Sequence, residues 1–231
     1  MWVFDQQNKE NRLIARHSVE TPMGQTRVYF RDVKTHMEFR RVMGGVAWPA
    51  GERPGFVVVV TEDDRVTPEL KTRILRIYAE HATTDVPGLI KRAYDLGYYY
   101  NVQTWYGDNS NEMMMKFVSV FNRKLPKTKK GMYLSNAPMV DDAHNLQLYA
   151  HQIRERIRPA KKSLYFGDFT QISGAFGVLT EEDVKKKRAG EFPAIAALGY
   201  VVAAMEEAYF DQGQARDLFN RHVAQQSVEG L

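Results

Sequence analysis

Five consecutive apolar residues, Phe56–Val60, constrain the fold of this chain more than any other feature of its sequence. Valine occupies the last four positions, and a β-branched run that is apolar throughout predicts a central strand buried on both faces. The proline- and glycine-rich segment Pro49–Gly55, which precedes the run, is a strong turn signal. Another apolar run ends just before this turn. The sequence therefore predicts a β-hairpin built from residues 44–48 and 56–61.

The stretch after the hairpin predicts a strand, a helix and a further strand. Residues 72–82 have the composition of a third strand, and 99–106 are aromatic and β-branched. Between them, Asp85 can cap a helix over 86–97, which Gly97 would end. Because a strand–helix–strand unit joins parallel strands, we expect 72–82 and 99–106 to form a parallel pair. The expected sheet is therefore mixed.

Hydrophobic spacing predicts helices along the second half of the chain, over 113–125, 141–158 and 193–210. The last is apolar nearly all round over its first three turns, which predicts a buried helix. We also expect short strands at 27–31, 132–134 and 164–166, a loop at 170–177 and a helix starting at Thr180. The predicted fold class is α/β, a mixed sheet flanked by helices. Residues 1–40 are expected to form an N-terminal β-rich extension or arm, and 41–231 the main domain.

The positive charge of the chain is concentrated in one segment. Lys and Arg total 32 and Asp and Glu total 28, a formal net charge of +4. Residues 123–163 hold ten basic and three acidic side chains, so this segment carries +7 and the rest of the chain −3. Such an excess is typical of a polyanion-binding surface, with a merely solubilising surface as the alternative. The candidate nucleic-acid-binding residues are Arg123, Lys124, Lys127, Lys129 and Lys130.

Several kinds of chemistry are excluded by residues that the sequence lacks. There is no cysteine, so disulfides, zinc fingers, iron–sulfur clusters and a thiol nucleophile are excluded. A Walker-type phosphate loop and a G-x-S-x-G elbow are also absent. The longest apolar stretch, Phe192–Ala204, has 13 residues, whereas a membrane span needs about 20. We therefore expect no membrane partner.

The predicted order of elements resembles the RNase H-like fold. More narrowly, three stretches resemble the C-terminal nuclease domain of the terminase large subunit of tailed bacteriophages. Residues 44–49 with 56–60 resemble the first hairpin of that family, 102–108 its fourth strand with a terminal acid, and 193–200 its closing helix. The likeness covers about residues 40–205. It implies an RNase H-like mixed sheet flanked by helices.

The resemblance also implies a chemistry, two-metal phosphodiester cleavage with Mg²⁺ or Mn²⁺ held by carboxylates. In the family these acids lie on the first strand, at the end of the fourth strand and on the closing helix. The matching positions here are Ala47, Asp108 and Ala196. Asp108 is thus the one catalytic and metal-binding candidate that remains. The implied site is degenerate.

Other acidic residues could replace the missing acids, and Asp108 itself could have a different role. The substitutes to consider are Glu62, Asp63, Asp64, Glu80, Asp168 and Glu191. Glu112 could join Asp108 in a weak single-metal site, or Asp108 and Asn109 could cap the following helix. Asp141, His144 and His151 share a helix stripe, and an exposed helix face is the simpler interpretation.

Three functions remain open at this point. The first is a terminase-nuclease-like domain of a phage or prophage that binds duplex DNA during DNA packaging, with cleavage weak or lost. The second is a non-catalytic protein-interaction module in phage assembly, with packaging or assembly proteins as partners. The third is an active two-metal nuclease with relocated acids, which would need Mg²⁺ or Mn²⁺. In each case the expected location is the cytoplasm of the host cell.

Overall fold

The protein is described by a computed structural model over residues 12–66, 73–136, 145–158, 162–166, 171–186 and 189–205. Within these residues, one eight-stranded mixed sheet runs in the order β1-β2-β3-β4-β5-β8, with β6 paired to β3 and β7 paired to β6. The strands are β1 (Ile14–Glu20), β2 (Thr26–Asp32), β3 (Glu38–Ala47), β4 (Gly55–Val66), β5 (Arg73–Thr83), β6 (Thr104–Gly107), β7 (Leu134–Asn136) and β8 (Leu164–Tyr165).

The predicted hairpin is confirmed as β3 and β4. These strands pair antiparallel from Val42 opposite Thr61 to Ala47 opposite Phe56. All four valines of the β4 run are fully buried. Val58 and Val60 face one hydrophobic cluster, whereas Val57 and Val59 face the other, so β4 is covered on both sides. A strand in this position needs apolar residues at every position, which is what the sequence supplies.

The crossover helix α1 (Val86–Tyr100) is longer than predicted. Its N-cap is Asp85, whose carboxylate accepts a hydrogen bond from the backbone N–H of Gly88 at 2.9 Å. The helix continues through Gly97 and ends at Asn101, which adopts the left-handed conformation with φ of 53°. Tyr98–Tyr100 therefore belong to α1, and the strand predicted over 99–106 is reduced to β6.

The predicted parallel pair is wrong in its partner. β6 is parallel to β3, with Val46 opposite Gly107, and is not a neighbour of β5. Both β5 and β6 run in the direction of β3, but β4 and β3 separate them. On the edge of β3 away from β4, β2 pairs only with Glu38 and Phe39, so the second half of that edge is left for β6, and α1 carries the chain back across the sheet to reach it.

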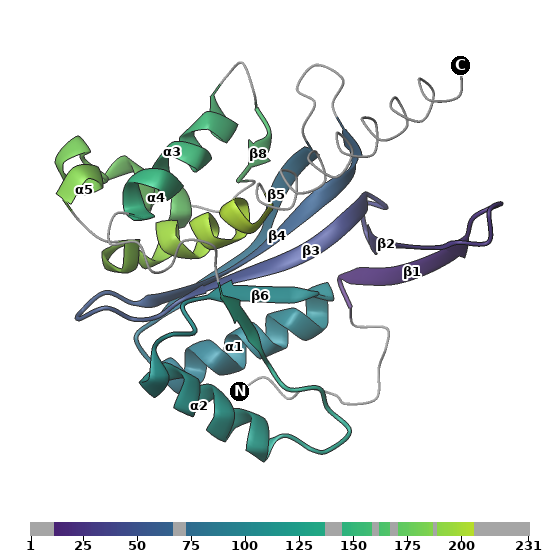
Figure 1. The fold of residues 1–231 in the computed structure, drawn as a ribbon, viewed down its shortest axis with the longest axis horizontal. Coiled ribbons are helices and arrows are strands. Elements are labelled where there is room, and N and C mark those ends of the chain that lie inside the picture. The colour runs from purple at the N-terminus through teal and green to yellow at the C-terminus, as the bar shows by residue number, and fades with distance from the viewer. Residues whose placement is uncertain are drawn as a thin grey trace, which may run out of the picture.

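Helices cover both faces of the sheet (Figure 1). On one face lie α1 and α2 (Glu112–Lys124), and on the other lie α3 (Asn145–Ile157), α4 (Gln171–Gly177), α5 (Glu181–Lys186) and the helix over 193–205, here called the closing helix. A short 3-10 helix, Ala189–Glu191, precedes the last of these. The architecture is the α/β class predicted, an RNase H-like mixed sheet flanked by helices.

The closing helix is buried, as predicted. Between Ile195 and Leu198 every side chain is fully inaccessible to solvent, and the same holds for Val201, Val202 and Met205. The tail of the expected helix, 206–210, lies outside the described residues, as do residues 141–144 at the expected start of α3.

The loop predicted over 170–177 is wrong, because the chain forms α4 from Gln171. Its first two backbone N–H groups, those of Gln171 and Ile172, donate to the Glu80 carboxylate at 3.0 and 3.3 Å. The helix is thus capped by a side chain from β5, about ninety residues earlier, which no local pattern reveals. The strand expected over 132–134 is also displaced, to β7.

The N-terminal extension is a hairpin of β1 and β2. Seven residue pairs join these two strands, but only two pairs, Phe30 with Phe39 and Arg31 with Glu38, join β2 to β3. The hairpin therefore projects beyond the main sheet (Figure 1). Phe30 and Phe39 are nevertheless buried at its base, so the extension shares the core on the α1 face.

Candidate functional site

Asp108 follows β6 at the end of the sheet where the family resemblance predicts an acid. The parallel register places Gly107 opposite Val46, so Asp108 and Ala47 are the next residues at the ends of two neighbouring strands. Carboxyl ends of adjacent parallel strands are where functional side chains of open α/β sheets converge. The structure thus brings together the first two positions of the predicted acid set.

The closing helix, which carries the third position, packs on β3 two residues before Ala47. A Cβ added at Gly45 would lie 1.9 Å from the carbonyl oxygen of Ala197, so the helix backbone rests directly on β3. Ala196 is fully buried, and Ala47 is 2% exposed in the same hydrophobic cluster. One turn beyond Ala196, burial raises the pKa of the Tyr200 hydroxyl and the negative charge of Asp108 raises it further.

Of the three predicted positions, two carry only methyl groups. Ala47 and Ala196 offer no oxygen, and both are packed as core residues. No group of three or more His, Asp or Glu side chains suited to a metal ion occurs in the described part of the chain. Two Mg²⁺ ions need several oxygen ligands, so the residues at this end of the sheet do not fit a two-metal centre.

Asp108 itself is engaged in local structure. Its carboxylate accepts hydrogen bonds from the backbone N–H and the hydroxyl of Ser110. Its carbonyl oxygen accepts a hydrogen bond from the indole N–H of Trp48 at 2.7 Å, which ties the ends of β3 and β6 together. The alternative that Asp108 caps the next helix is wrong. Asn111 is the N-cap of α2 and accepts from the backbone N–H of Met114.

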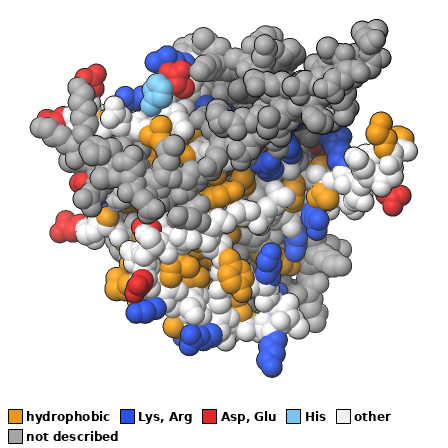
Figure 2. Space-filling model, in the orientation of Figure 1, with side chains coloured by type: hydrophobic (Ala, Val, Ile, Leu, Met, Phe, Trp, Pro, Cys, Tyr) orange, Lys and Arg blue, Asp and Glu red, His pale blue; other side chains and the backbone are white. Residues whose placement is uncertain are grey.

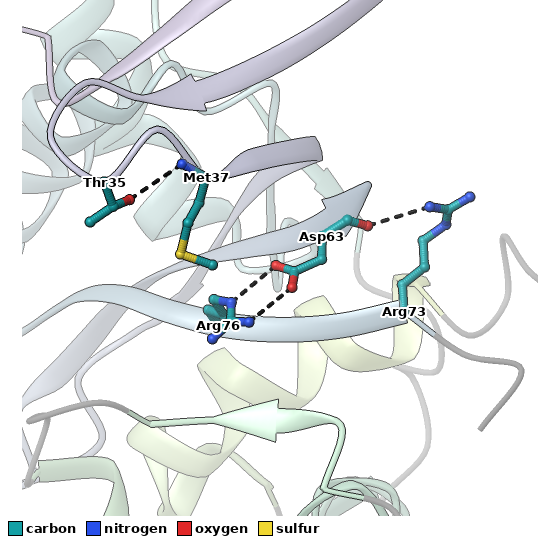
Figure 3. A network of polar contacts seen from close by, with 5 residues as sticks. All are labelled: Thr35, Met37, Asp63, Arg73 and Arg76. Atoms are coloured by element: carbon teal, nitrogen blue, oxygen red, sulfur yellow. Dashed lines mark hydrogen bonds and ion pairs between the residues drawn. The ribbon is translucent and has the colours of Figure 1, made fainter. Parts of the chain in front are cut away.

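The substitute acids whose contacts are described are bound elsewhere. Glu62 is 1% exposed and lies 3.6 Å from the guanidinium of Arg41. Asp63 forms a two-point ion pair with Arg76, at 3.1 and 3.0 Å, and its carbonyl accepts from Arg73 (Figure 3). Both acids follow the β4 run by several residues, which places them at the opposite end of β4 from Ala47.

The other candidate acids do not complete a site either. Glu80 caps α4, and Glu112 is exposed in the first turn of α2. Glu191 is exposed in the 3-10 helix before the closing helix. Asp168 lies outside the described residues, as does the side chain of Asp64. Of the predicted helix stripe, Asp141 and His144 also lie outside them, whereas His151 is exposed on α3.

The basic segment is divided between two surfaces. Arg123 and Lys124 end α2, where cations complement the helix dipole, and the lysines at 127, 129 and 130 lie in the loop that follows. Arg154 and Arg156 lie in the last turn of α3, on the other face of the sheet. There Arg156 is 5% exposed, and Arg158 forms an ion pair with Glu155. The described basic residues of this segment therefore lie on two surfaces, and the candidate nucleic-acid-binding residues belong to the first.

The loop after α2, here called the basic loop (residues 125–133), is held in place by Asn122. The side-chain amide of Asn122 donates to the carbonyl of Met132 at 2.7 Å and accepts from its N–H at 2.8 Å. Within the loop, the N–H of Lys129 donates to the carbonyl of Pro126. Lysine and arginine side chains gather over this lower part of the molecule and up the side of the β1–β2 hairpin (Figure 2). Acidic side chains are sparse there.

Sequence reasoning missed a pocket beside this loop. It has a volume of about 560 Å³ and lies between the last turns of α1, the start of β6 and the basic loop. Tyr98 is among its lining residues. The sequence did not predict this surface, because the aromatic run 98–100 has the composition of a strand although it ends α1. The residue that could have indicated the longer helix is Asn101, because asparagine tolerates the left-handed conformation at a helix end.

The fold is an RNase H-like α/β domain, and Ala47, Asp108 and Ala196 occupy the positions at which the resemblance predicts carboxylates. Comparison of the chain with protein-family models, with curated proteins and with solved structures found no match. Among the helices of the described residues, none has the length and apolar character that crossing a bilayer requires.

Proposed function

We propose that this protein is a terminase-nuclease-like domain that binds duplex DNA and has weak or no phosphodiester-cleaving activity. The proposal is carried by the adjacent ends of β3 and β6, where Ala47 and Asp108 lie, with the closing helix packed on β3 and its Tyr200 within the electrostatic influence of Asp108. On this proposal, two of the three positions that hold metal ligands in the resembled family are filled by alanines that pack in the core. Phage or prophage origin and a role in DNA packaging follow from the resemblance and are part of the proposal.

DNA binding is supported by the surface at the end of α2. Arg123, Lys124, Lys127 and Lys130 are exposed. Lys129 is partly buried beside Tyr98. Cations that neutralise phosphates release condensed counterions, which supplies most of the free energy of non-specific DNA binding. Exposed lysines on a loop fixed at both ends can contact a backbone without a large ordering cost.

Loss of cleavage is supported by the missing ligands. In two-metal hydrolysis, one ion activates the attacking water and the other stabilises the leaving oxygen. A single carboxylate at Asp108 cannot position two metal ions, and its Oδ1 already accepts two hydrogen bonds from Ser110. Removing stabilisation of this kind costs orders of magnitude in rate.

A second candidate, a protein-interaction module, is favoured by the β1–β2 hairpin. This hairpin projects from the sheet and carries exposed apolar residues, among them Val19 and Met23, which are 50% and 88% exposed. Exposed apolar side chains at a projecting edge are typical of contact surfaces. The partner would be another packaging or assembly protein.

The proposed function is tested by measuring DNA binding and cleavage on the same preparation. We expect the full chain to shift a short duplex in a gel or anisotropy assay and to leave supercoiled plasmid intact in both Mg²⁺ and Mn²⁺. Asp108→Ala is the control. Robust cleavage that this single change abolishes would contradict the degenerate site and establish an active nuclease with relocated acids. Absence of duplex binding at low salt would contradict the DNA-binding half and favour the interaction module.

A further inference from the structure

The pocket beside the basic loop has the charge of an anion-binding site. Three of its lining residues, Arg12, Lys129 and Lys130, are cationic, and none of the described residues that line it is acidic. Its volume of about 560 Å³ lies within the range of roughly 300–1,000 Å³ that is usual for ligand sites. A pocket with this lining favours a ligand that carries negative charge.

Two of these cations are held close to the same aromatic ring. The guanidinium carbon of Arg12 lies 4.7 Å from the centre of the Tyr98 ring, and the Nζ of Lys129 lies 5.3 Å from it. Arg12 also donates to the side-chain oxygen of Asn101, the residue that ends α1. Both distances are within the range of cation–π attraction, so the two charges are positioned before any ligand arrives. Two positive charges that line one pocket favour an anionic ligand in it.

The same pocket offers aromatic faces as well as charge. Tyr133 belongs to the basic loop and is 68% exposed, although it is large and apolar over most of its surface. Trp105, 6% exposed, contributes a second aromatic wall from β6. An exposed tyrosine beside lysines is the pairing with which proteins hold unpaired nucleotides, because the ring stacks on a base while the cations neutralise its phosphate.

We infer that this pocket binds an unpaired nucleotide of a single strand, with its phosphate at Arg12 and Lys129 and its base stacked on Tyr133. A base inside a duplex is covered on both faces by its neighbours and cannot reach the ring, so the preferred ligand is single-stranded. The inference rests on the proposed function in one respect, since Lys129 and Lys130 belong to both surfaces. It adds that the basic loop distinguishes single-stranded from duplex DNA.

The pocket is separate from the degenerate centre. Thr104, at the start of β6, lines the pocket, whereas Asp108 follows the other end of that strand. Four residues of extended strand correspond to about 13 Å. Single-stranded DNA bound in the pocket therefore needs no contact with Asp108.

The test compares an oligothymidylate of about ten nucleotides with a short mixed-sequence duplex, using labelled DNA and fluorescence anisotropy on the full chain. We expect Tyr133→Ser to weaken binding of the single strand about tenfold, the effect of losing one stacked base. Binding of the duplex should change less than twofold. Tyr165→Ser is the matched control, because Tyr165 is 43% exposed on β8, at the opposite edge of the sheet, and should leave both affinities unchanged.

Two further variants separate this inference from the proposed function. Lys124 and Lys127 are exposed outside the pocket, so changing both to Ala should weaken the duplex more than the single strand. Suppose that the lysine changes weaken duplex binding and that Tyr133→Ser affects neither ligand. This result would overturn the inference of a nucleotide pocket and leave the proposed function intact. Single-strand binding that depends on Tyr133, with no duplex binding at all, would support the pocket and overturn the proposed function.

Free thymidine monophosphate and inorganic phosphate distinguish a nucleotide site from a simple anion site. We expect the nucleotide to compete with labelled oligothymidylate at concentrations at least tenfold below those of phosphate, and we expect Tyr133→Ser to abolish that difference. Equal competition by the two compounds in the unaltered protein would overturn the inference, because it would show that the rings contribute nothing.

Discussion

Gly45 and Ala196 show how single residues decide the geometry of the candidate site. The closing helix can lie on β3 because Gly45 has no side chain between the strand and the carbonyl of Ala197. Ala196, the preceding residue of the helix, then faces the core without a polar group to satisfy. Small residues thus allow close packing between the closing helix and β3, beside a position at which the resemblance predicts a carboxylate.

The close approach at Gly45 predicts the effect of Gly45→Ala. An added Cβ would overlap the backbone oxygen of Ala197, which cannot rotate away as a side chain would. We expect a loss of about 3 kcal/mol in the free energy of unfolding, the upper part of the usual range for overpacking. Urea denaturation measures it. Gly174→Ala in α4 is the control, since no atom lies within 4 Å of its added Cβ, and it should be neutral or slightly stabilising.

A second residue-scale prediction concerns restoring the missing acids with Ala47→Asp and Ala196→Asp together. Without metal, three carboxylates near one another should make this variant less stable than the natural protein. With Mn²⁺ at about 100 times its dissociation constant, its melting temperature should rise by about 5–10 °C. Adding Asp108→Asn to the same variant should remove most of that rise. A folded double variant whose melting temperature ignores Mn²⁺ would show that the three positions do not converge.

At the scale of the elements, two carboxylates on strands organise the backbone of another segment. Glu80 of β5 caps α4, and Asp32 at the end of β2 closes the turn into β3. Burial alone would raise the pKa of Asp32, but hydrogen bonds from the backbone N–H groups of Thr35 and Lys34 and from Tyr78 together lower it. The carboxylate therefore fixes the β1–β2 hairpin to the sheet.

A pH dependence follows from the lowered pKa of Asp32. A group of this kind adds stability above its unfolded pKa, near 3.9, and loses it as the pH falls toward the lower folded value. We expect Asp32→Asn to reduce stability at neutral pH and to flatten the decline below about pH 4. Denaturant titrations at several pH values measure both effects. If stability below about pH 4 declines equally in the variant and the natural protein, Asp32 contributes no pH-dependent stability.

The closing helix supplies a further prediction at this scale. Ala203 is 4% exposed, so Ala203→Asp would bury a charge without a partner. We expect it to cost about 3 kcal/mol or more in unfolding free energy. Ala194→Asp is the matched control, because Ala194 is only partly buried in the first turn, where a negative charge favours the helix dipole. Equal melting temperatures for the two variants would show the helix to be peripheral.

For the whole molecule, the property that bears most on the proposed DNA binding is the distribution of charge between the two helical layers. The basic loop adjoins the α1–α2 face, whereas the arginines of α3 lie on the other. We expect the change of Lys124, Lys127, Lys129 and Lys130 to Ala to reduce the slope of log K against log salt for duplex DNA, by about 0.9 for each phosphate that the variant no longer neutralises. Changing the exposed Lys34 and Arg154 should affect the slope little. A slope unaltered by the four changes would exclude the basic loop from DNA binding.

The sequence by itself determined the local elements of this protein. The valines of β4, the cap at Asp85 and the small apolar residues after Pro193 each specify a strand or helix through patterns that a few neighbouring residues create. It also determined the chemistry available at positions 47, 108 and 196, because an alanine cannot ligate a metal wherever it lies.

Only the tertiary structure decided which elements meet. The choice of β3 as the partner of β6, the capping of α4 by Glu80 and the division of the basic segment between two faces all depend on contacts between residues far apart in the sequence. The pocket at Tyr98 likewise needs Arg12, α1 and the basic loop to come together. Local patterns carry no record of such contacts, since hydrogen bonding and packing act on distance in space and not on separation along the chain.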